Sequence, residues 1–362
     1  MTIQFIEEST LTAMADAIRA ATGTTGTMKP HAISKGIAAI KDYSNSREGK
    51  YVWSVQSGNG TTVDANAETK YVASNDTATY PIDGWIDTDY FKLVKKPETI
   101  VNGVKIVEWN NGTDEEICNM VAAADEGKIN LADYWSVGDT RTVQLSAIAA
   151  TYVNYLNPGV RESHDAQPVE LVLMHAGGYD LNAAVASGRT KCSFVVGMKD
   201  ALVNDGYMNH NSKNEGSWDG CKRRTWCNSA FKNAIPSTLL PIFKQFKTIT
   251  ADTNHIQAEL KTSVDWFALP AVKEVFGGSA TSSGVDTSFS DLIEFNALFQ
   301  FDWYKTAANR VKKHGMTGSK TMSWERSPYY KGSSSFCFVN PDGSADISEA
   351  NRDKAISPFG CI

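Results

Sequence analysis

The sequence has little of what a membrane, nucleic-acid or metal-binding protein needs. No apolar run in the 362 residues reaches the length of about 20 residues that a membrane-spanning helix requires, so we expect no membrane insertion. The formal net charge is −6 and the nearest basic cluster, Lys222-Arg223-Arg224, is short, which argues against nucleic acid as a partner. The six cysteines form no CxxC pair and have no zinc-like spacing with histidine, so we expect buried thiols, no metal site and no cofactor.

What is present suits a folded protein of several parts. Hydrophobic residues make up 42% of the chain and aromatic residues 10%, enough for a full core. A length of 362 residues predicts two or three domains. The N-terminus lacks the basic and apolar regions of a secretion signal, so we expect synthesis in the cytoplasm.

The first hundred residues divide into two segments. Residues 1–42 predict two short helices with narrow apolar stripes, which bury little alone and would attach the chain to another chain or bring protomers together. The alternative is a helical hairpin that rests on its own chain. Residues 50–97 predict a small all-β module, with strands at 51–53 and 71–73 and turns at 58–60 and 81–84.

Residues 99–362 mix helices and strands. Thr113 and Glu116 form a capping box that predicts a helix ending near Gly127. Further expected helices cover 218–231 and 239–246, and expected strands cover 142–145, 170–174, 194–197 and 266–269. Because these elements do not alternate as βαβ units, the expected class is α+β.

The last forty residues alternate fixed anchors with polar segments. Trp324, Arg326 and Pro328 make a compact structural motif, and 336–339 predicts a half-buried strand followed by a tight turn at 340–343. The chain ends in Pro358-Phe-Gly-Cys-Ile362, which we expect to tuck into a sheet or core.

Residues of another kind lie between these anchors. Tyr supplies contact area at low entropic cost, and Ser and Asn supply adaptable hydrogen bonds, so the segment predicts a binding surface on a rigid scaffold. The candidate receptor-binding residues are Tyr329, Tyr330, Lys331, Ser333, Ser335, Asp342, Ser344, Asp346, Ser348, Asn351 and Arg352. The alternative is an ordinary hairpin with a solvated outer face.

Several short motifs in this order resemble the DUF6273 family over residues 105–362. They are Gly112-Thr-Asp-Glu-Glu-Ile117, Asp133–Asp139, Trp218, Arg224, Trp266 with Glu274-Val275, Trp324-Glu-Arg-Ser-Pro328, Asp342-Gly343 and the terminal Pro358–Ile362. Such domains are common in phage and prophage proteins, and are related in fold to C-type lectin domains and to the formylglycine-generating enzyme. The resemblance therefore implies a C-terminal C-type-lectin-like domain.

Two further resemblances point to a virion. Leu11–Arg19 is similar to N-terminal segments of phage tail proteins. The C-terminal segment also resembles the variable region of proteins diversified by retroelements, in which Tyr329–Ser335 and Ser344–Arg352 would be the changeable positions.

The residues give little support for catalysis or for a bound ion. Cys337 and Cys361 lie near the region where the formylglycine-generating relatives carry a cysteine pair, but apolar neighbours predict that both pack as small hydrophobes. Asp342, Ser344 and Asp346 offer alternating oxygens, yet the run lacks the further carboxylates of a calcium loop. We expect no enzyme.

Two ion pairs are expected to fix loops: Asp139 with Arg141, and Glu325 with Arg326. In such a motif Arg326 is more often a buried structural residue than a ligand contact.

The functional expectation is a phage virion protein of the tail tip, fibre or baseplate. Its C-terminal domain would bind a host cell-surface polysaccharide or protein, and its other partners would be virion proteins and copies of itself, with a trimer as the natural arrangement. The alternative is a purely structural virion component, such as a head decoration or baseplate protein. A third reading is an enzyme related to formylglycine generation.

Overall fold

The computed structural model divides the chain into two compact units, Met1–Thr99 and Ile100–Ile362. The residues that it describes are 51–56, 69–73, 90–95, 99–149, 163–252, 259–277, 293–329 and 332–362. The helices expected within 1–42 and the turns expected at 58–60 and 81–84 lie outside the described residues.

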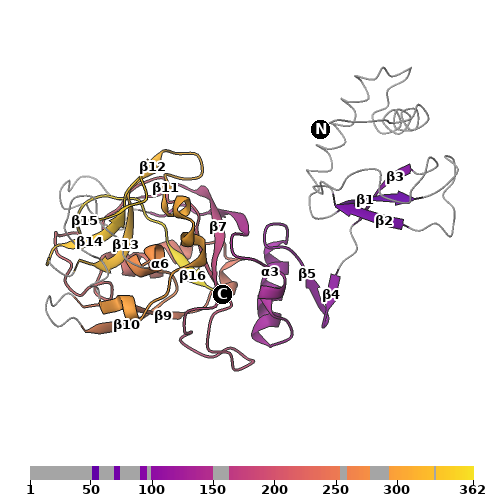
Figure 1. Ribbon diagram of the computed structural model, residues 1–362, viewed down its shortest axis with the longest axis horizontal. Helices are drawn as coiled ribbons and strands as arrows, with labels where there is room; N and C mark the ends of the chain where they lie inside the picture. Colours follow the sequence, from indigo (N-terminus) through magenta and orange to yellow (C-terminus); the bar gives the residue numbers. More distant parts are fainter. Residues whose placement is uncertain are drawn as a thin grey trace, which may run out of the picture. The chain divides into compact units, whose positions relative to one another are not determined.

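The described part of the first unit is an antiparallel sheet of three strands (Figure 1). These are β1 (Tyr51–Gln56), β2 (Thr69–Ala73) and β3 (Tyr90–Lys95). β1 is central, and its Trp53 lies opposite Val72 of β2 and Leu93 of β3. The strands predicted at 51–53 and 71–73 are confirmed, and β3, rich in aromatic and branched residues, adds a third.

A four-stranded antiparallel sheet of order β16-β8-β7-β6 lies in the second unit. Its strands are β6 (Thr140–Leu145), β7 (Gln167–Ala176), β8 (Phe194–Met198) and β16 (Phe359–Cys361). All five residues of β8 are buried, as its continuous apolar sequence predicts. The C-terminus tucks into this sheet as expected: Cys361 lies opposite Val195, and the Ile362 N–H donates to the Phe194 carbonyl at 3.0 Å (Figure 1).

Helix α3 (Asp114–Asp125) begins at the predicted capping box. The Thr113 hydroxyl accepts from the Glu116 N–H at 3.2 Å, and the Glu116 carboxylate accepts from the Thr113 N–H at 2.8 Å. The helix buries one apolar face, made of Ile117, Met120, Val121, Ala123 and Ala124.

Arg141 joins this helix to β6, but not through the expected partner. Its guanidinium pairs with Asp114 at 2.5 Å instead of with Asp139. Asp139 accepts from the backbone N–H of Ser136 at 2.8 Å, which closes the loop before β6. The predicted Asp139–Arg141 pair is therefore wrong, because the short Asp139 side chain is used within its own loop.

The C-terminal segment forms a second antiparallel sheet of order β13-β14-β15. β13 (Ser323–Pro328) and β14 (Ser335–Val339) are buried at every position, whereas in β15 (Ala345–Glu349) only Ala345 is buried. A strand is confirmed at 336–339, but the expectation that it is half-buried is wrong, because every residue of β14 is buried. The turn after it is also confirmed: the Gly343 N–H donates to the Asn340 carbonyl at 2.9 Å.

Three strand pairs complete the sheets: β9 (Phe246–Ala251) with β10 (Leu260–Asp265), β4 (Thr99–Val101) with β5 (Val104–Ile106), and β11 (Lys312–Lys313) with β12 (Lys320–Thr321). The helix expected at 239–246 is wrong. The helical part is only the short η3 (Leu240–Ile242), and β9 follows, with buried Phe246, Thr248 and Thr250 alternating with outer residues.

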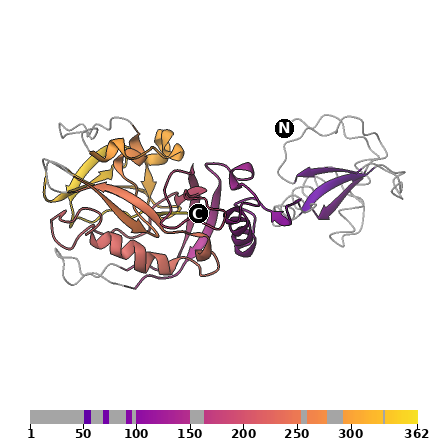
Figure 2. The same ribbon diagram turned by 90° about the horizontal axis from the view of Figure 1, so that it is seen from below.

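The helix expected at 218–231 starts later and runs further. It is α4 (Lys222–Trp226), then a π-helical turn η2 (Cys227–Phe231), then α5 (Lys232–Ala234), which Figure 2 shows as one continuous ribbon. Among the described residues, the remaining helical segments are short: α6 (Val272–Phe276), η1 (Leu131–Asp133), η5 (Ile293–Asn296), η6 (Asp302–Lys305) and η7 (Ala307–Arg310).

A buried carboxylate joins Trp218 and Arg224, two residues of the motif series. Asp265, fully buried at the end of β10, accepts from the Trp218 indole N–H at 2.9 Å and from Arg224 Nε at 2.6 Å. The Thr248 hydroxyl and the Asn228 amide donate to it at 2.6 and 3.0 Å. Four donors from three segments thus hold one charge in the core.

Residues 266–269 do not form the predicted strand. Asn228 Oδ1 accepts from the backbone N–H of Trp266 at 2.5 Å and from that of Phe267 at 3.4 Å, so a side chain takes the place of a strand partner. Only Ala268 pairs like a strand residue, with Phe359 of β16.

The described architecture is mixed, with many strands in small sheets and few helices. The expectation of buried thiols is confirmed for five of the six cysteines; all six are free, and Cys118 is half-buried. In the part of the chain that is described, no helix combines the length and the apolar character needed to cross a membrane.

Candidate functional site

The turn between β14 and β15 is closed by its own side chains. Asp342 Oδ1 accepts from the Ser344 backbone N–H at 2.9 Å and from its hydroxyl at 2.7 Å, and these bonds lower the pKa of Asp342. The Asn340 amide donates to the Ser344 hydroxyl at 3.2 Å. The turn therefore presents a fixed polar surface at the start of β15.

Five of the predicted binding residues form what we call the β15 surface: Asp342, Ser344, Asp346, Ser348 and Arg352. Asp342 and Arg352 are exposed, and the other three are half-exposed. Asp346 and Ser348 alternate along β15 and pair in register with Phe338 and Phe336 of β14, so these four side chains lie on the same face of the sheet. Ser333 is also exposed but lies in the loop before β14.

Three predicted binding residues are corrected by their burial. Tyr329 and Ser335 are each 9% exposed and Asn351 is 5% exposed, so in this fold they offer little contact area to a ligand. The Tyr329 N–H donates to the Ser335 carbonyl at 2.9 Å, which places both at the inner base of one loop. Tyr330 and Lys331, the remaining two candidates, lie outside the described residues.

Asn214 forms hydrogen bonds with the backbone of the loop between Tyr329 and Ser335. It is 1% exposed, and its side-chain amide donates to the carbonyls of Gly332 and Ser335, both at 2.9 Å. Its backbone N–H donates to the Ser333 carbonyl at 3.0 Å. Sequence reasoning missed Asn214, because an isolated Asn more than a hundred positions away carries no signal of this role.

The structural motif of β13 is buried as a unit. The Trp324 indole N–H donates to the Gly206 carbonyl at 2.8 Å, which ties β13 to a distant loop. Arg326 is fully buried and donates to the carbonyl of Leu269 at 2.8 Å and to that of Ile249 at 3.3 Å. Pro328 is also buried and ends the strand.

Arg326 has a different ionic partner from the one expected. Both guanidinium nitrogens of its fork contact Glu274 of α6, at 2.6 Å each, and Tyr179 donates its hydroxyl proton to the same carboxylate. Burial disfavours the charged guanidinium, but the Glu274 carboxylate outweighs this and raises the pKa of Arg326. The predicted Glu325–Arg326 pair is wrong, because adjacent residues of a strand point to opposite faces.

A second buried carboxyl, Glu294, lies beside this pair. It accepts from the Ser327 hydroxyl, and from the Ala251 N–H at 2.9 Å. Burial raises the pKa of Glu294 above its ordinary value of 4.5. Neighbouring residues of the motif, Arg326 and Ser327, therefore bind different acids from different segments.

Glu325 is the unusual member of the motif. It is fully buried, and neither carboxyl oxygen has a hydrogen-bond partner among the described residues. It lines a cavity of about 10 Å³, close to the space that one water occupies. Burial, together with the Glu294 and Glu274 carboxylates, raises the pKa of Glu325 well above 4.5 and so favours the neutral acid.

Neither cysteine considered for catalysis has the features of a reactive thiol. Cys337 and Cys361 are fully buried, and burial raises the pKa of both thiols well above 9.0. A nucleophilic or metal-binding cysteine is instead partly exposed with a lowered pKa. Within the described ranges, no three His, Cys, Asp or Glu side chains are grouped to hold a metal ion.

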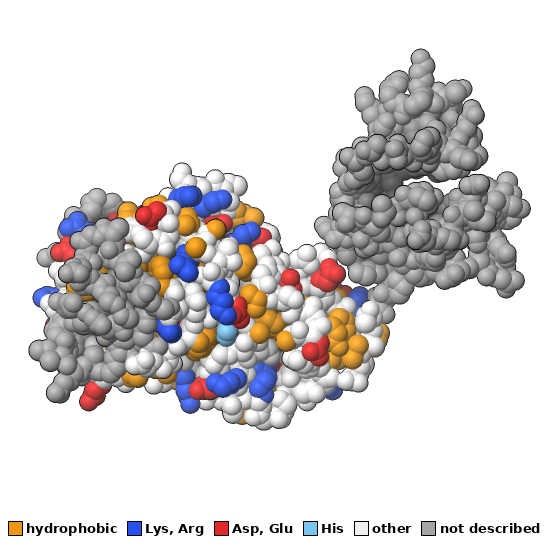
Figure 3. Space-filling view, viewed as in Figure 1, with side chains coloured by type: hydrophobic (Ala, Val, Ile, Leu, Met, Phe, Trp, Pro, Cys, Tyr) orange, Lys and Arg blue, Asp and Glu red, His pale blue; other side chains and the backbone are white. Residues whose placement is uncertain are grey.

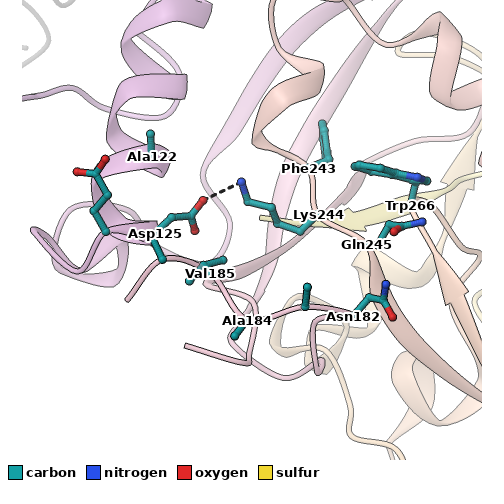
Figure 4. Close-up of a pocket in the computed structure, with 12 residues that line it drawn as sticks. Ala122, Asp125, Asn182, Ala184, Val185, Phe243, Lys244, Gln245 and Trp266 are labelled. Carbon is teal, nitrogen blue, oxygen red and sulfur yellow. Dashed lines mark ion pairs between the residues drawn. The ribbon is translucent and has the colours of Figure 1, made fainter. Parts of the chain in front are cut away.

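A groove of about 460 Å³ lies elsewhere on the second unit, between the end of α3, the loop at 182–186 and the segment at 243–245 (Figure 4). Asp125 of α3 pairs with Lys244 at 2.7 Å across it. Trp266, one of the motif residues, lines the same groove.

Charge is not concentrated on the face shown in Figure 3. Basic and acidic side chains of the described residues are interspersed there with polar and apolar ones. This agrees with the mild net charge of −6 and offers no single-sign patch on that face.

The comparison with known families finds one match in this region. No curated protein and no solved structure matches the chain. Residues 195–362 match the model of a family described as "Domain of unknown function (DUF6273)", a shorter span than the 105–362 of the resemblance. The matched segment contains the Arg326 motif, Asn214 and the β15 surface, and the match supports the assignment of this part of the chain to the DUF6273 family.

Proposed function

We propose that this chain is a phage virion protein of the tail tip, fibre or baseplate, and that its C-terminal domain binds a receptor on the host cell. The domain would have the C-type-lectin-like fold that the DUF6273 resemblance implies. The ligand would be a surface polysaccharide or protein. This function rests on the virion resemblances together with the geometry of the last sheet.

The contrast within that sheet carries the proposal. β13 and β14 are buried at every position, while the β15 surface is polar and open. A fixed scaffold that displays adaptable polar groups loses little entropy on binding. With Tyr329 buried, recognition would rest on Arg352 and the hydrogen-bonding groups of Asp346 and Ser348.

Attachment to the particle would fall to the first unit. Its N-terminal segment would contact other virion proteins or bring protomers together as a trimer. Many copies on one particle would raise the effective concentration at the cell surface, so that weak single contacts suffice.

The alternative is a structural virion component without receptor binding. The β15 surface favours this reading in one respect: none of its five residues is aromatic, and Trp and Tyr, with Arg, dominate binding hot spots. Arg352 is the one residue of that type on the surface, and Glu349 already pairs with it at 3.0 Å.

Adsorption of the purified full chain to host cells tests the proposal. Labelled wild type would be compared with the triple variant Asp346→Ala/Ser348→Ala/Arg352→Ala. A matched control would change an acid, a serine and a base exposed elsewhere on the second unit, as Asp133→Ala/Ser136→Ala/Lys128→Ala.

We expect saturable binding that the β15 variant weakens at least about tenfold, the loss expected when a hot spot is removed. The control should bind like wild type. Wild type that ignores host cells, even when multimerised, but binds virion particles would favour the structural alternative.

Diversification by a retroelement is a separate, finer part of the proposal. Sequences of related isolates should then differ mainly within 344–352 and in the loop before β14. Substitutions spread evenly along the chain would contradict it.

A further inference from the structure

The groove between α3, the loop at 182–186 and the segment at 243–245 is lined by different residues at its two ends. Figure 4 shows Ala122 and Asp125 at one end, and Asn182, Gln245 and Trp266 at the other. Its volume of about 460 Å³ falls in the range of small-ligand sites. The groove shares no residue with the β15 surface.

The side-chain amides of Asn182 and Gln245 lie at one end of the groove. The backbone N–H of Asn182 donates to the Gln245 carbonyl at 2.9 Å, which fixes the two residues side by side. Within the described part of the chain, neither side-chain amide has a hydrogen-bond partner. Each amide offers two donors and an acceptor, a combination that matches the hydroxyl groups of a sugar.

Trp266 adds a fixed aromatic surface beside these amides. Asn228 accepts its backbone N–H at 2.5 Å, and Lys232 Nζ lies 4.1 Å from the ring centroid. The ring is half-buried and lines the groove. An indole held in this way presents an apolar face on which the C–H face of a sugar ring can pack.

The charged residues that line the groove already have partners. Asp125 uses one carboxylate oxygen for Lys244 and the other for Arg189, both at 2.7 Å. Glu126 pairs with Lys128 at 2.6 Å. Lys244, the basic residue among those that line the groove, is therefore already paired, and the exposed Ala122 and Ala184 give shallow walls rather than the enclosed pocket that a lipid needs.

We propose that this groove binds an uncharged oligosaccharide, whose ring packs on Trp266 and whose hydroxyl or acetamido groups bond to Asn182 and Gln245. The inference does not depend on the virion assignment or on the β15 surface. It gives the second unit a saccharide site that the C-terminal strands do not contribute to.

Nuclear magnetic resonance of the full ¹⁵N-labelled chain tests this site. Chitotriose and cellotriose are the probes, at up to about 10 mM, where millimolar binding is visible. At least one should shift the Trp266 indole N–H signal. The double variant Asn182→Ala/Gln245→Ala should bind at least about tenfold more weakly, a loss of about 1.4 kcal/mol.

Asn182 is exposed and Gln245 half-exposed, so this variant should fold even if Trp266→Ala does not. A matched control, Lys247→Ala/Thr262→Ala, changes two exposed residues of β9 and β10 and should keep the affinity within about twofold, a change that is small beside the expected tenfold loss. Two outcomes would overturn the proposal: no shift of the Trp266 signal by either trisaccharide, or undiminished binding by the Asn182/Gln245 variant.

Discussion

β13 and β15 belong to one sheet, separated only by β14, yet they treat charge in opposite ways. β13 buries Arg326 and Glu325 completely, whereas β15 leaves Asp346 and Glu349 half-exposed in contact with water. Charged residues are therefore buried on β13 and partly exposed two strands away on β15. On β13 a buried ionisable group either has a dedicated partner, as Arg326 has, or favours its neutral form, as Glu325 does; on β15 water solvates the charge.

The difference shows that β13 stabilises the fold through contacts with distant segments, whereas the β15 surface remains exposed and bonds only locally. Arg326 donates hydrogen bonds to Glu274 and to the carbonyls of Leu269 and Ile249, so β13 connects α6 and β9 to the last sheet. No comparable bond joins the β15 surface to distant segments of the described chain. Its residues bond to near neighbours, as Asp342 does with Ser344 and Arg352 with Glu349.

Arg326→Met should have the largest effect. It leaves Glu274 buried without its cation, and removing one partner of a buried pair costs about 3–5 kcal/mol. Urea unfolding of the full chain measures the change. A loss below about 1 kcal/mol, the value typical of exposed pairs, would contradict the claim that the buried pair of β13 contributes more to stability than the exposed pair of β15.

Asn214→Ala should come next. It removes the two 2.9 Å bonds to the Gly332 and Ser335 carbonyls, at a cost of about 1–3 kcal/mol. The Ser335 carbonyl keeps its bond from the Tyr329 N–H. Faster amide hydrogen exchange in the loop before β14, with β8 unchanged, would show that Asn214 fixes this loop. Unchanged exchange there would contradict the role.

Glu325→Gln should change how the free energy of unfolding depends on pH. The folded-state pKa of Glu325 lies above its ordinary 4.5, so its contribution to stability is present below that pH and is lost as the pH rises toward the folded value. The amide cannot lose a proton. Between about pH 5 and about pH 8 the free energy of unfolding should therefore fall less in the variant than in wild type.

Glu349→Gln is the matched control for that experiment, since Glu349 is half-exposed on β15. It removes only an exposed pair with Arg352 and should change the free energy of unfolding by less than about 1 kcal/mol. Equal slopes for wild type and Glu325→Gln would mean that Glu325 is ionised in the folded protein.

Ser348→Ala should have the smallest effect on stability. Its side chain is half-exposed and has no hydrogen-bond partner in the described chain, so the free energy of unfolding should change by less than about 0.5 kcal/mol. Thermal unfolding measures this. A larger loss would place Ser348 in the scaffold rather than on the displayed surface.

Local sequence signals predicted the local structure well. The capping box at Thr113, the turn at 340–343 and the apolar C-terminus are read from neighbouring residues, and the fold follows them. The expected helix at 239–246 failed because its second half pairs with distant segments, Lys244 with Cys361 and Phe246 with β10, and this pairing outweighs a weak helical stripe.

Partners distant in sequence could not be predicted. Glu274 lies 52 positions from Arg326, and Asn214 lies 118 positions from Gly332. The burial of Tyr329 follows from the loop that Asn214 holds, so its apparent role as an exposed anchor could not be corrected from composition. The sequence thus indicated where the β15 surface lies, but not which of its neighbours are buried.

Two double-mutant cycles test the central claim most directly. One combines Arg326→Met with Glu274→Leu, and the other combines Arg352→Met with Glu349→Leu; unfolding free energies of all variants give each coupling energy. The account predicts a coupling above about 2 kcal/mol for the buried pair and below about 0.5 kcal/mol for the exposed pair. Couplings of equal size would contradict the division between a buried scaffold and a displayed surface.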